Sequence, residues 1–192
     1  MINIASEELA TVRIYTRGGD EGETGLLYGG RISKSDLRCE AYGSVDEAVS
    51  ALGLARSTSR DARVQATIKE LQRDLFTVGA ELATDVAEYT KLEKHFSVVT
   101  ARMTEHLEQN IDELASEVTL PQQFIIPGAS PTSAALDMAR SSLRRAERRT
   151  VQLQESGQLY NKEVLKYLNR AADLIFMLAR YQDRELPIET LS

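Results

Sequence analysis

Arginine is concentrated in one stretch of this chain, residues 130–151, which reads SPTSAALDMARSSLRRAERRTV. Five arginines set against Asp137 and Glu147 give this stretch a formal charge of +3, although the whole chain carries −6. They are Arg140, Arg144, Arg145, Arg148 and Arg149. On a helix Arg140 and Arg144 lie one turn apart, so their guanidinium groups can line one side of an anion-binding site. The alternative is an exposed helix face on which arginine and glutamate pair with one another.

The same stretch has an apolar side that would face a protein core. Its members recur at spacings of three and four residues, as on one face of a helix. They are Leu136, Ala139, Leu143 and Ala146. Glu147 and Arg148 continue the polar row beyond Arg144, whereas Arg145 and Arg149 are expected to be solvated surface charges. A cationic row beside a core-facing stripe is how a helical bundle would line a pocket for an anion.

Length and apolar patterning indicate one compact unit. The 192 residues are enough for a sizeable core, and we expect a single domain over 1–192. No apolar run approaches the roughly 20 residues of a membrane span, and the first residues lack the basic and then apolar pattern of a secretion signal. We therefore expect a soluble, cytoplasmic protein without a membrane partner.

Cysteine, histidine and net charge exclude several kinds of site. Cys39 is the only cysteine, which rules out an internal disulfide and a thiolate metal cluster. His95 and His106 are the only histidines, so a histidine-rich transition-metal site is not expected. A chain with a net charge of −6 has no broad basic surface for nucleic acid. A small polyanion at the arginine row remains compatible with this composition.

Helical apolar spacing runs through nearly all of the chain after residue 44 and predicts an all-α fold. Ser44 and Glu47 form a capping-box pattern that would begin the first helix. Ser130 and Pro131 would begin the fourth, and Gly157 would end it. The narrow stripes suit a five-helix, up-and-down bundle. The predicted helices cover 44–56, 62–84, 100–117, 130–157 and 161–181.

The N-terminal part lacks this spacing. Residues 12–16 (VRIYT) indicate a short strand, and residues 16–38 hold six of the eleven glycines without regular periodicity. So long a segment is usually functional or disordered. Glycine-rich backbone can direct its N–H groups at an anion, with added contacts from Thr16, Arg17 and Lys34. A flexible tail is the alternative, and no Walker A pattern is present.

Four blocks, in the same order and at matching intervals, resemble the PduO-type ATP:cob(I)alamin adenosyltransferases. They are YTRGGDEGETGL at 15–26, RCEAYGSVDE at 38–47, FIIPGASPTSAALDMARSSLRRAER at 124–148 and LNRAADLIFMLAR at 168–180. The resemblance implies transfer of the 5′-deoxyadenosyl group of ATP to the cobalt of cob(I)alamin, with adenosylcobalamin and triphosphate as products. It also implies a homotrimer with active sites between neighbouring subunits.

This resemblance divides the expected domain into three parts. A strand and glycine-rich, nucleotide-binding loop (1–43) precede the helical bundle (44–182) and a C-terminal tail (183–192). It further implies two kinds of protein partner: a reductase that supplies electrons and an adenosylcobalamin-dependent enzyme that receives the product. The sequence identifies neither.

Catalytic roles follow from the resemblance residue by residue. Arg140 and Arg144 match the two functional arginines of the family's A-R-x-x-x-R-R-A-E-R motif, and Glu147 matches its glutamate. Asp46 matches an aspartate that pairs across the subunit boundary with the position of Arg140. Phe124 matches an aromatic residue that keeps the lower face of the corrinoid clear of its nucleotide base. The open alternatives are an acid favoured by the helix dipole for Asp46 and a core side chain for Phe124.

The nucleotide site implied by the resemblance combines the glycine-rich loop with the helices. Mg²⁺ would be held mainly by the ATP phosphates, with Glu147 as the candidate protein ligand. Asn169 has an alternative reading as part of a satisfied polar network with Asp173. The implied nucleotide-binding residues are Thr16, Arg17, Gly18, Gly19, Asp20, Gly22, Thr24, Gly25, Lys34, Arg144, Glu147 and Asn169.

Three positions depart from the family pattern. Arg17 stands where lysine is usual, and Ala129 replaces the second glycine of a Pro-Gly-Gly turn, which would strain a positive φ. Asp137 stands where histidine is frequent, and it could pair with Arg140 in competition with Asp46. The alternative function is a non-catalytic corrinoid or nucleotide chaperone that delivers cofactor to a partner enzyme. The retained set of Arg140, Arg144, Glu147 and Asn169 argues against it.

Overall fold

The computed structural model describes residues 15 and 17–191, and this part of the chain is mostly helical. The predicted strand at 12–16 lies outside the described residues except for Tyr15, and Thr16 lies outside them too. Six α-helices are present in the described part, together with a 3₁₀ turn at Val86–Glu88 and one hairpin. The helices are α1 (Leu37–Thr58), α2 (Ala62–Leu82), α3 (Tyr89–His95), α4 (Ala101–Glu117), α5 (Pro131–Glu155) and α6 (Glu163–Gln182).

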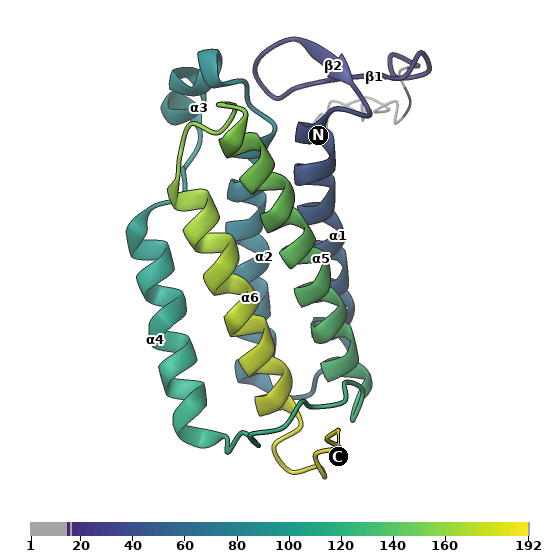
Figure 1. The fold of residues 1–192 in the computed structure, drawn as a ribbon, viewed down its shortest axis with the longest axis vertical. Helices are drawn as coiled ribbons and strands as arrows, with labels where there is room; N and C mark the ends of the chain where they lie inside the picture. The colour runs from purple at the N-terminus through teal and green to yellow at the C-terminus, as the bar shows by residue number, and fades with distance from the viewer. Residues whose placement is uncertain (1–14, 16, 192) are drawn as a thin grey trace, which may run out of the picture.

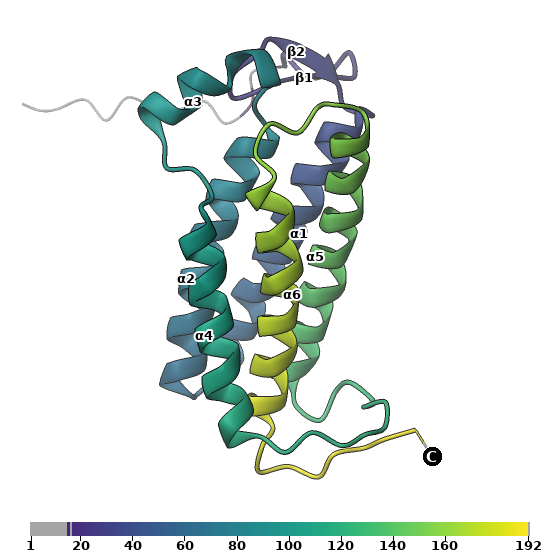
Figure 2. The same cartoon turned by 60° about the vertical axis from the view of Figure 1, so that its left-hand side comes forward.

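The long helices run side by side along the molecule (Figures 1 and 2). Helix α5 packs against α1 and α6, and α6 also packs against α4. The hairpin and α3 lie at one end of the bundle, and the C-terminal tail lies at the other (Figure 1). None of the helices in the described part is both long and apolar enough to cross a membrane.

Helix ends are fixed by side chains that satisfy the first backbone N–H groups. Asp61 caps α2 by accepting from Arg63 N and Val64 N. Ser130 caps α5, with Pro131 in its first turn, as the sequence predicts. Along α5 the predicted apolar stripe is fully buried, so its arginines are held at defined positions around the helix.

Helix α1 begins at Leu37, and the predicted start at Ser44 is wrong. Asp36 caps the helix by accepting from Arg38 N. Ser44 is buried within α1, where its Oγ donates to the Glu40 carbonyl at 2.8 Å. The apolar face extends back to Ala41, which is fully buried, so continuing the helix toward its N-terminus gains core contacts that outweigh the local capping pattern.

Helix α3 was not predicted, because a seven-residue helix shows too few turns for periodicity to be recognised. It lies over a buried carboxylate. Glu81 accepts from Tyr89 Oη at 2.7 Å, Val99 N at 2.5 Å and Asn161 Nδ2 at 3.0 Å. Burial raises the pKa of the Glu81 carboxyl, although these hydrogen bonds oppose the shift. Tyr89 stacks on Tyr160 with ring centroids 4.1 Å apart.

The glycine-rich segment contains an antiparallel hairpin of β1 (Glu23–Gly25) and β2 (Arg31–Ser33). Between the strands Gly29 has φ 124°, and a Cβ there would lie 2.4 Å from Asp85 Cβ. The hairpin is therefore pressed against the connection that follows α2. Leu27 N donates to the Ala83 carbonyl, and Asp85 N donates to the Tyr28 carbonyl, each at 2.9 Å.

Buried Arg38 secures the same end of the bundle. Its Nη1 donates to the carbonyls of Leu82 at 2.9 Å and Thr84 at 2.7 Å, and its Nη2 donates to the Gln158 carbonyl at 2.9 Å. Three chain segments thus converge on one guanidinium group. Burial lowers the pKa of Arg38 despite nearby carboxylates. The loop that carries the predicted nucleotide contacts consequently sits on a fixed platform.

Candidate active site

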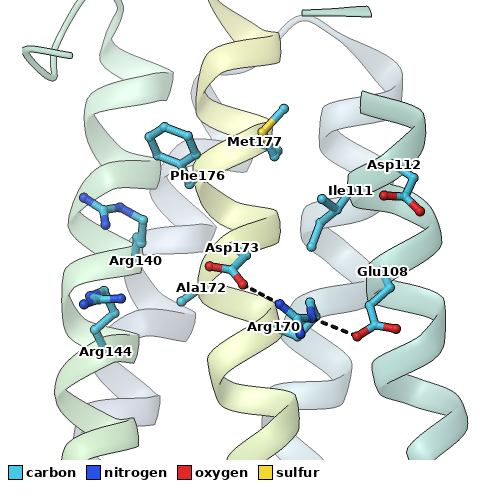
Figure 3. Close-up of a pocket in the computed structure, with 10 residues that line it drawn as sticks. All are labelled: Glu108, Ile111, Asp112, Arg140, Arg144, Arg170, Ala172, Asp173, Phe176 and Met177. Atoms are coloured by element: carbon cyan, nitrogen blue, oxygen red, sulfur yellow. Dashed lines mark hydrogen bonds and ion pairs between the residues drawn. The ribbon is translucent and has the colours of Figure 1, made fainter. Parts of the chain in front are cut away.

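A pocket of about 510 Å³ lies between α4, α5 and α6. Figure 3 shows Arg140 and Arg144 one turn apart on α5, with α6 between them and the acidic side chains of α4. One wall is therefore basic, and the opposite wall carries carboxylates that pair in part with Arg170. The lining residues are Glu108, Ile111, Asp112, Arg140, Arg144, Arg170, Ala172, Asp173, Phe176 and Met177.

Arg140 is held against the pocket wall. Its side chain is 30 % exposed, and its Nε lies 3.4 Å from Asp137 Oδ1 one turn earlier. Its guanidinium carbon lies 5.8 Å from the centroid of the Phe176 ring, within the range of a cation–π contact. The predicted pairing with Asp137 is thus present, and the distance makes it a weak one.

Arg144 is exposed and has no hydrogen bond or ion pair with any residue in the described part of the chain. Its charge has no protein counterion there, although it sits in a pocket. Arg145 and Arg149 differ, because they pair with Glu47 and Glu40 of α1. Both arginines are surface charges, as expected, and each has an acidic partner that the sequence did not indicate. An anion entering the pocket meets Arg144 first as an available cation.

Glu147 and Asn169 meet across α5 and α6. Asn169 Nδ2 donates to Glu147 Oε1 at 3.0 Å, so two predicted nucleotide-site residues are brought together beyond Arg144. Asn169 and Asp173 are both exposed, and Asp173 pairs with Arg170 at 2.7 Å. The alternative reading of Asn169 and Asp173 as a buried polar network is wrong in this structure.

The glycine-rich loop closes on itself. Lys34 Nζ donates to the Gly19 carbonyl at 2.7 Å, and Arg31 Nη2 donates to the Gly18 carbonyl. Arg17 has a left-handed φ of 61°, a conformation that costs a non-glycine residue energy and persists where the surrounding structure holds it. The loop holds together, at the hairpin end, the residues Arg17, Gly18, Gly19, Asp20, Gly22, Thr24, Gly25 and Lys34.

Asp46 and Phe124 lie elsewhere on the same chain. Asp46 is exposed beside a second hollow of about 450 Å³ between α1 and α2, and within the described part it has no ion pair with Arg140. Phe124 is 81 % exposed, which excludes the core alternative within this chain. Its carbonyl accepts from Leu191 N at 2.9 Å, so the C-terminal tail holds its segment.

The turn at Gly128 and Ala129 does not have the strain expected from the alanine. Gly128 has φ 114°, whereas Ala129 does not have a positive φ, so alanine fits the turn without the expected strain. The sequence also missed several lining residues. Phe176 and Arg170 fall inside the block at 168–180, and Glu108 and Asp112 are one turn apart on α4. The i,i+4 spacing of these two acids could have indicated that they lie on one face of α4.

These features define a class: a helical bundle that presents a partly uncompensated basic pocket, with a glycine-rich hairpin at one end. The profile of the cobalamin adenosyltransferase family matches residues 14–182. The chain belongs to this family.

Known corrinoid adenosyltransferases are similar to this chain over most of its length. A corrinoid adenosyltransferase of Citrobacter freundii is 39 % identical over 171 residues, covering 89 % of this chain and 95 % of that protein. One from Mycobacterium leprae is 37 % identical over 171 residues, covering 88 % and 90 %. A variant of the PduO-type ATP:corrinoid adenosyltransferase of Lactobacillus reuteri, complexed with cobalamin and ATP, superposes with a TM-score of 0.84. It is 34 % identical, and the match covers 93 % of this chain and 99 % of that one.

Proposed function

We propose that this protein transfers the 5′-deoxyadenosyl group of ATP to the cobalt of cob(I)alamin, forming adenosylcobalamin and releasing triphosphate. The observation that carries the proposal is the polar row of α5 and α6 in a chain of this family. Arg144 offers a cation without a counterion in the described part of the chain. Next to it, Glu147 and Asn169 are already joined by a hydrogen bond.

The chemistry needs few catalytic groups from the protein. The Co(I) centre is itself a strong nucleophile, so no general base is required. The cobalt–carbon bond forms as the C5′–oxygen bond breaks, and the electron pair of that bond leaves with triphosphate. The protein must align the two reactants and stabilise the charge on the leaving group. We assign Arg144 and the glycine-rich loop with Lys34 to that charge.

Glu147 is the candidate protein ligand for Mg²⁺. Carboxylate oxygen suits this ion, which usually binds through one or two carboxylates together with substrate phosphates. Among residues 15 and 17–191 no group of three or more His, Cys, Asp or Glu side chains could hold a metal by itself. One carboxylate beside an anion pocket fits an ion carried mainly by ATP. When bound, Mg²⁺ would neutralise part of the developing phosphate charge.

We further propose that the site is completed between subunits of a homotrimer. Within one chain the loop lies at the hairpin end, while Arg140 and Arg144 line the pocket between α4, α5 and α6. Asp46 lies beside a different hollow, whose lining is largely apolar. There Leu27 and Phe76 are 43 % and 67 % exposed and line the same hollow, and adjoining exposed apolar side chains of this kind are typical of association surfaces. A neighbour's Asp46 would then reach Arg140.

Phe124 is assigned to the corrinoid. An exposed aromatic side chain on a segment anchored by the C-terminal tail can press against a flat ring system from below. Excluding a lower axial ligand makes reduction of Co(II) to Co(I) easier, because that ligand donates electrons to the metal. This assignment rests on the family resemblance together with the exposure of the side chain.

One mixture tests the function. The protein is combined with ATP, Mg²⁺ and chemically reduced cobalamin, and the visible spectrum is followed. Growth of the adenosylcobalamin spectrum supports the enzyme. Corrinoid binding without alkylation would instead support a chaperone that delivers cofactor, and an unchanged spectrum would remove both functions.

A further inference from the structure

A buried carboxylate links two arginines behind the basic wall of the pocket. Asp137 of α5 and Arg180 of α6 are each only 7 % exposed, and Arg180 Nη2 donates to Asp137 Oδ2 at 2.5 Å. The other oxygen, Oδ1, lies 3.4 Å from Arg140 Nε. Asp137 is therefore shared unequally: closely with Arg180 and loosely with Arg140.

Both guanidinium groups lie within cation–π range of the Phe176 ring. The Arg180 guanidinium carbon lies 5.3 Å from the ring centroid, and that of Arg140 lies 5.8 Å from it. Arg180 Nε is buried and has no hydrogen-bond partner, so Asp137 is the group that compensates the buried Arg180 charge. A buried charge that loses its partner is strongly unfavourable, which ties Asp137 to Arg180.

We propose that Arg180 forms an ion pair with Asp137 and thereby keeps the charge of Arg140 available to a ligand or to a neighbouring carboxylate. The three groups, Asp137, Arg140 and Arg180, together carry +1, and the excess positive charge lies on the pocket side at Arg140. Without Arg180, Asp137 and Arg140 form a neutral pair one helical turn apart. Asp137 and Arg180 are thus positioning residues for the site, and the inference rests on the proposed role of Arg140 there.

This arrangement also explains how an acid can stand one helical turn before Arg140 without cancelling its charge. Alone, an acid one turn before Arg140 would cancel the charge that the pocket needs. With Arg180 bound to its far oxygen, the acid orients Arg140 without neutralising it. Whether Asp137 neutralises Arg140 therefore depends on Arg180.

The test is a rescue experiment on the full-length protein. Arg180→Met keeps much of the side-chain length and removes the charge. Asp137 should then form its ion pair with Arg140. Arg140 is then no longer available to a neighbour's Asp46, and the proposed interface that completes the nucleotide site is weakened. ATP affinity, measured by calorimetry without corrinoid, should therefore fall about 10- to 100-fold, the usual effect of losing a hydrogen bond to a charged group. Adding Asp137→Asn frees Arg140 again, and the double variant should return to within about threefold of the wild type, because the neutralising acid is gone.

Arg184→Met is the matched control. Arg184 pairs with Asp61 at 3.1 Å, away from the pocket, so its loss should leave ATP affinity unchanged. Thermal unfolding separates stability from binding. If Arg180→Met does not fold, Arg180→Lys is used instead. It keeps a cation next to Asp137 and should bind ATP like the wild type. A folded Arg180→Met with normal affinity, a double variant no better than that single, or a folded Arg180→Lys with lost affinity would overturn the inference.

A crystal structure of Arg180→Met supplies a readout that does not depend on the reaction. The distance between Arg140 Nε and Asp137 Oδ1 should shorten from 3.4 Å to about 2.8 Å, the usual length of a charge-assisted hydrogen bond. If the wild type fails to form adenosylcobalamin but, in Arg180→Met, Arg140 moves and ATP affinity falls, the proposed function is wrong and this inference stands. If adenosylcobalamin forms but Arg140 stays in place, the inference is wrong and the function stands.

Discussion

Helix α5 carries arginine on two sides, and the two sides have different surroundings. Toward α1, Arg145 and Arg149 pair with Glu47 and Glu40. Toward α6, Arg140 has one loose acidic contact, and Arg144 has no hydrogen-bond or ion-pair partner in the described part. We propose that the same residue type serves helix packing on one side of α5 and ligand binding on the other. Counterions, rather than the number of arginines, distinguish a binding site from a charged surface.

Arg144→Ala should have the largest effect. Its guanidinium has no other task within the described chain, so the variant should fold normally and lose about 10- to 100-fold in kcat/KM, as expected when a charge-assisted contact to the reacting ligand is removed. Glu147→Ala should act in the same direction. Steady-state kinetics and circular dichroism measure both, with Arg149→Ala as the matched variant on the α1 side. A folded Arg144→Ala with near-normal turnover would remove this residue from the site.

Asp46→Asn should lower activity less strongly, although Asp46 touches no substrate in the proposed trimer. The loss arises because the neighbour's Arg140 is no longer held by a carboxylate. Asp46→Arg combined with Arg140→Asp should recover part of the activity. A double-mutant cycle and light scattering check this prediction. Absence of coupling between the two positions, or a fully active monomer, would contradict the subunit interface.

Phe124→Ala should act only on the corrinoid side of the reaction. With a weak reductant, adenosylation should fall strongly, and with Co(I) formed chemically beforehand the loss should be much smaller. The KM for ATP should stay near its original value. Since Phe124 is 81 % exposed, stability should change by less than about 1 kcal/mol, far from the roughly 3–5 kcal/mol of an emptied core site. Reduced ATP affinity in this variant would make the assignment wrong.

The sequence predicted much of α5 because its signals are local. Ser130, Pro131 and the apolar stripe lie within one helix, and the structure has each in its predicted place. The start of α1 was wrong because a local capping pattern competed with burial of Ala41. Helix α3 was too short to leave a periodic pattern.

The ion-pair partners of the arginines could not be predicted from the sequence. Arg145 meets Glu47 across 98 residues, and Asp137 meets Arg180 across 43 residues. Such pairs depend on the rotation of packed helices, which apolar spacing determines only approximately. The row of Arg140, Arg144 and Glu147 was visible in the sequence, but which arginines retain an uncompensated charge required the neighbouring helices.

Arg145→Ala should have the smallest effect and defines the other side of the comparison. The Arg145 and Glu47 side chains are 42 % and 60 % exposed, and exposed ion pairs typically contribute about 0–1 kcal/mol. We expect the free energy of unfolding to fall by no more than about 1 kcal/mol at low salt, with less difference at high salt because the pair is screened. Urea denaturation at two salt concentrations measures this, and turnover should stay within about twofold of the wild type, as expected for a surface change remote from the site. A loss of turnover as large as that of Arg144→Ala in an intact assembly would mean that both sides of α5 serve the site, and the distinction by counterions would fail.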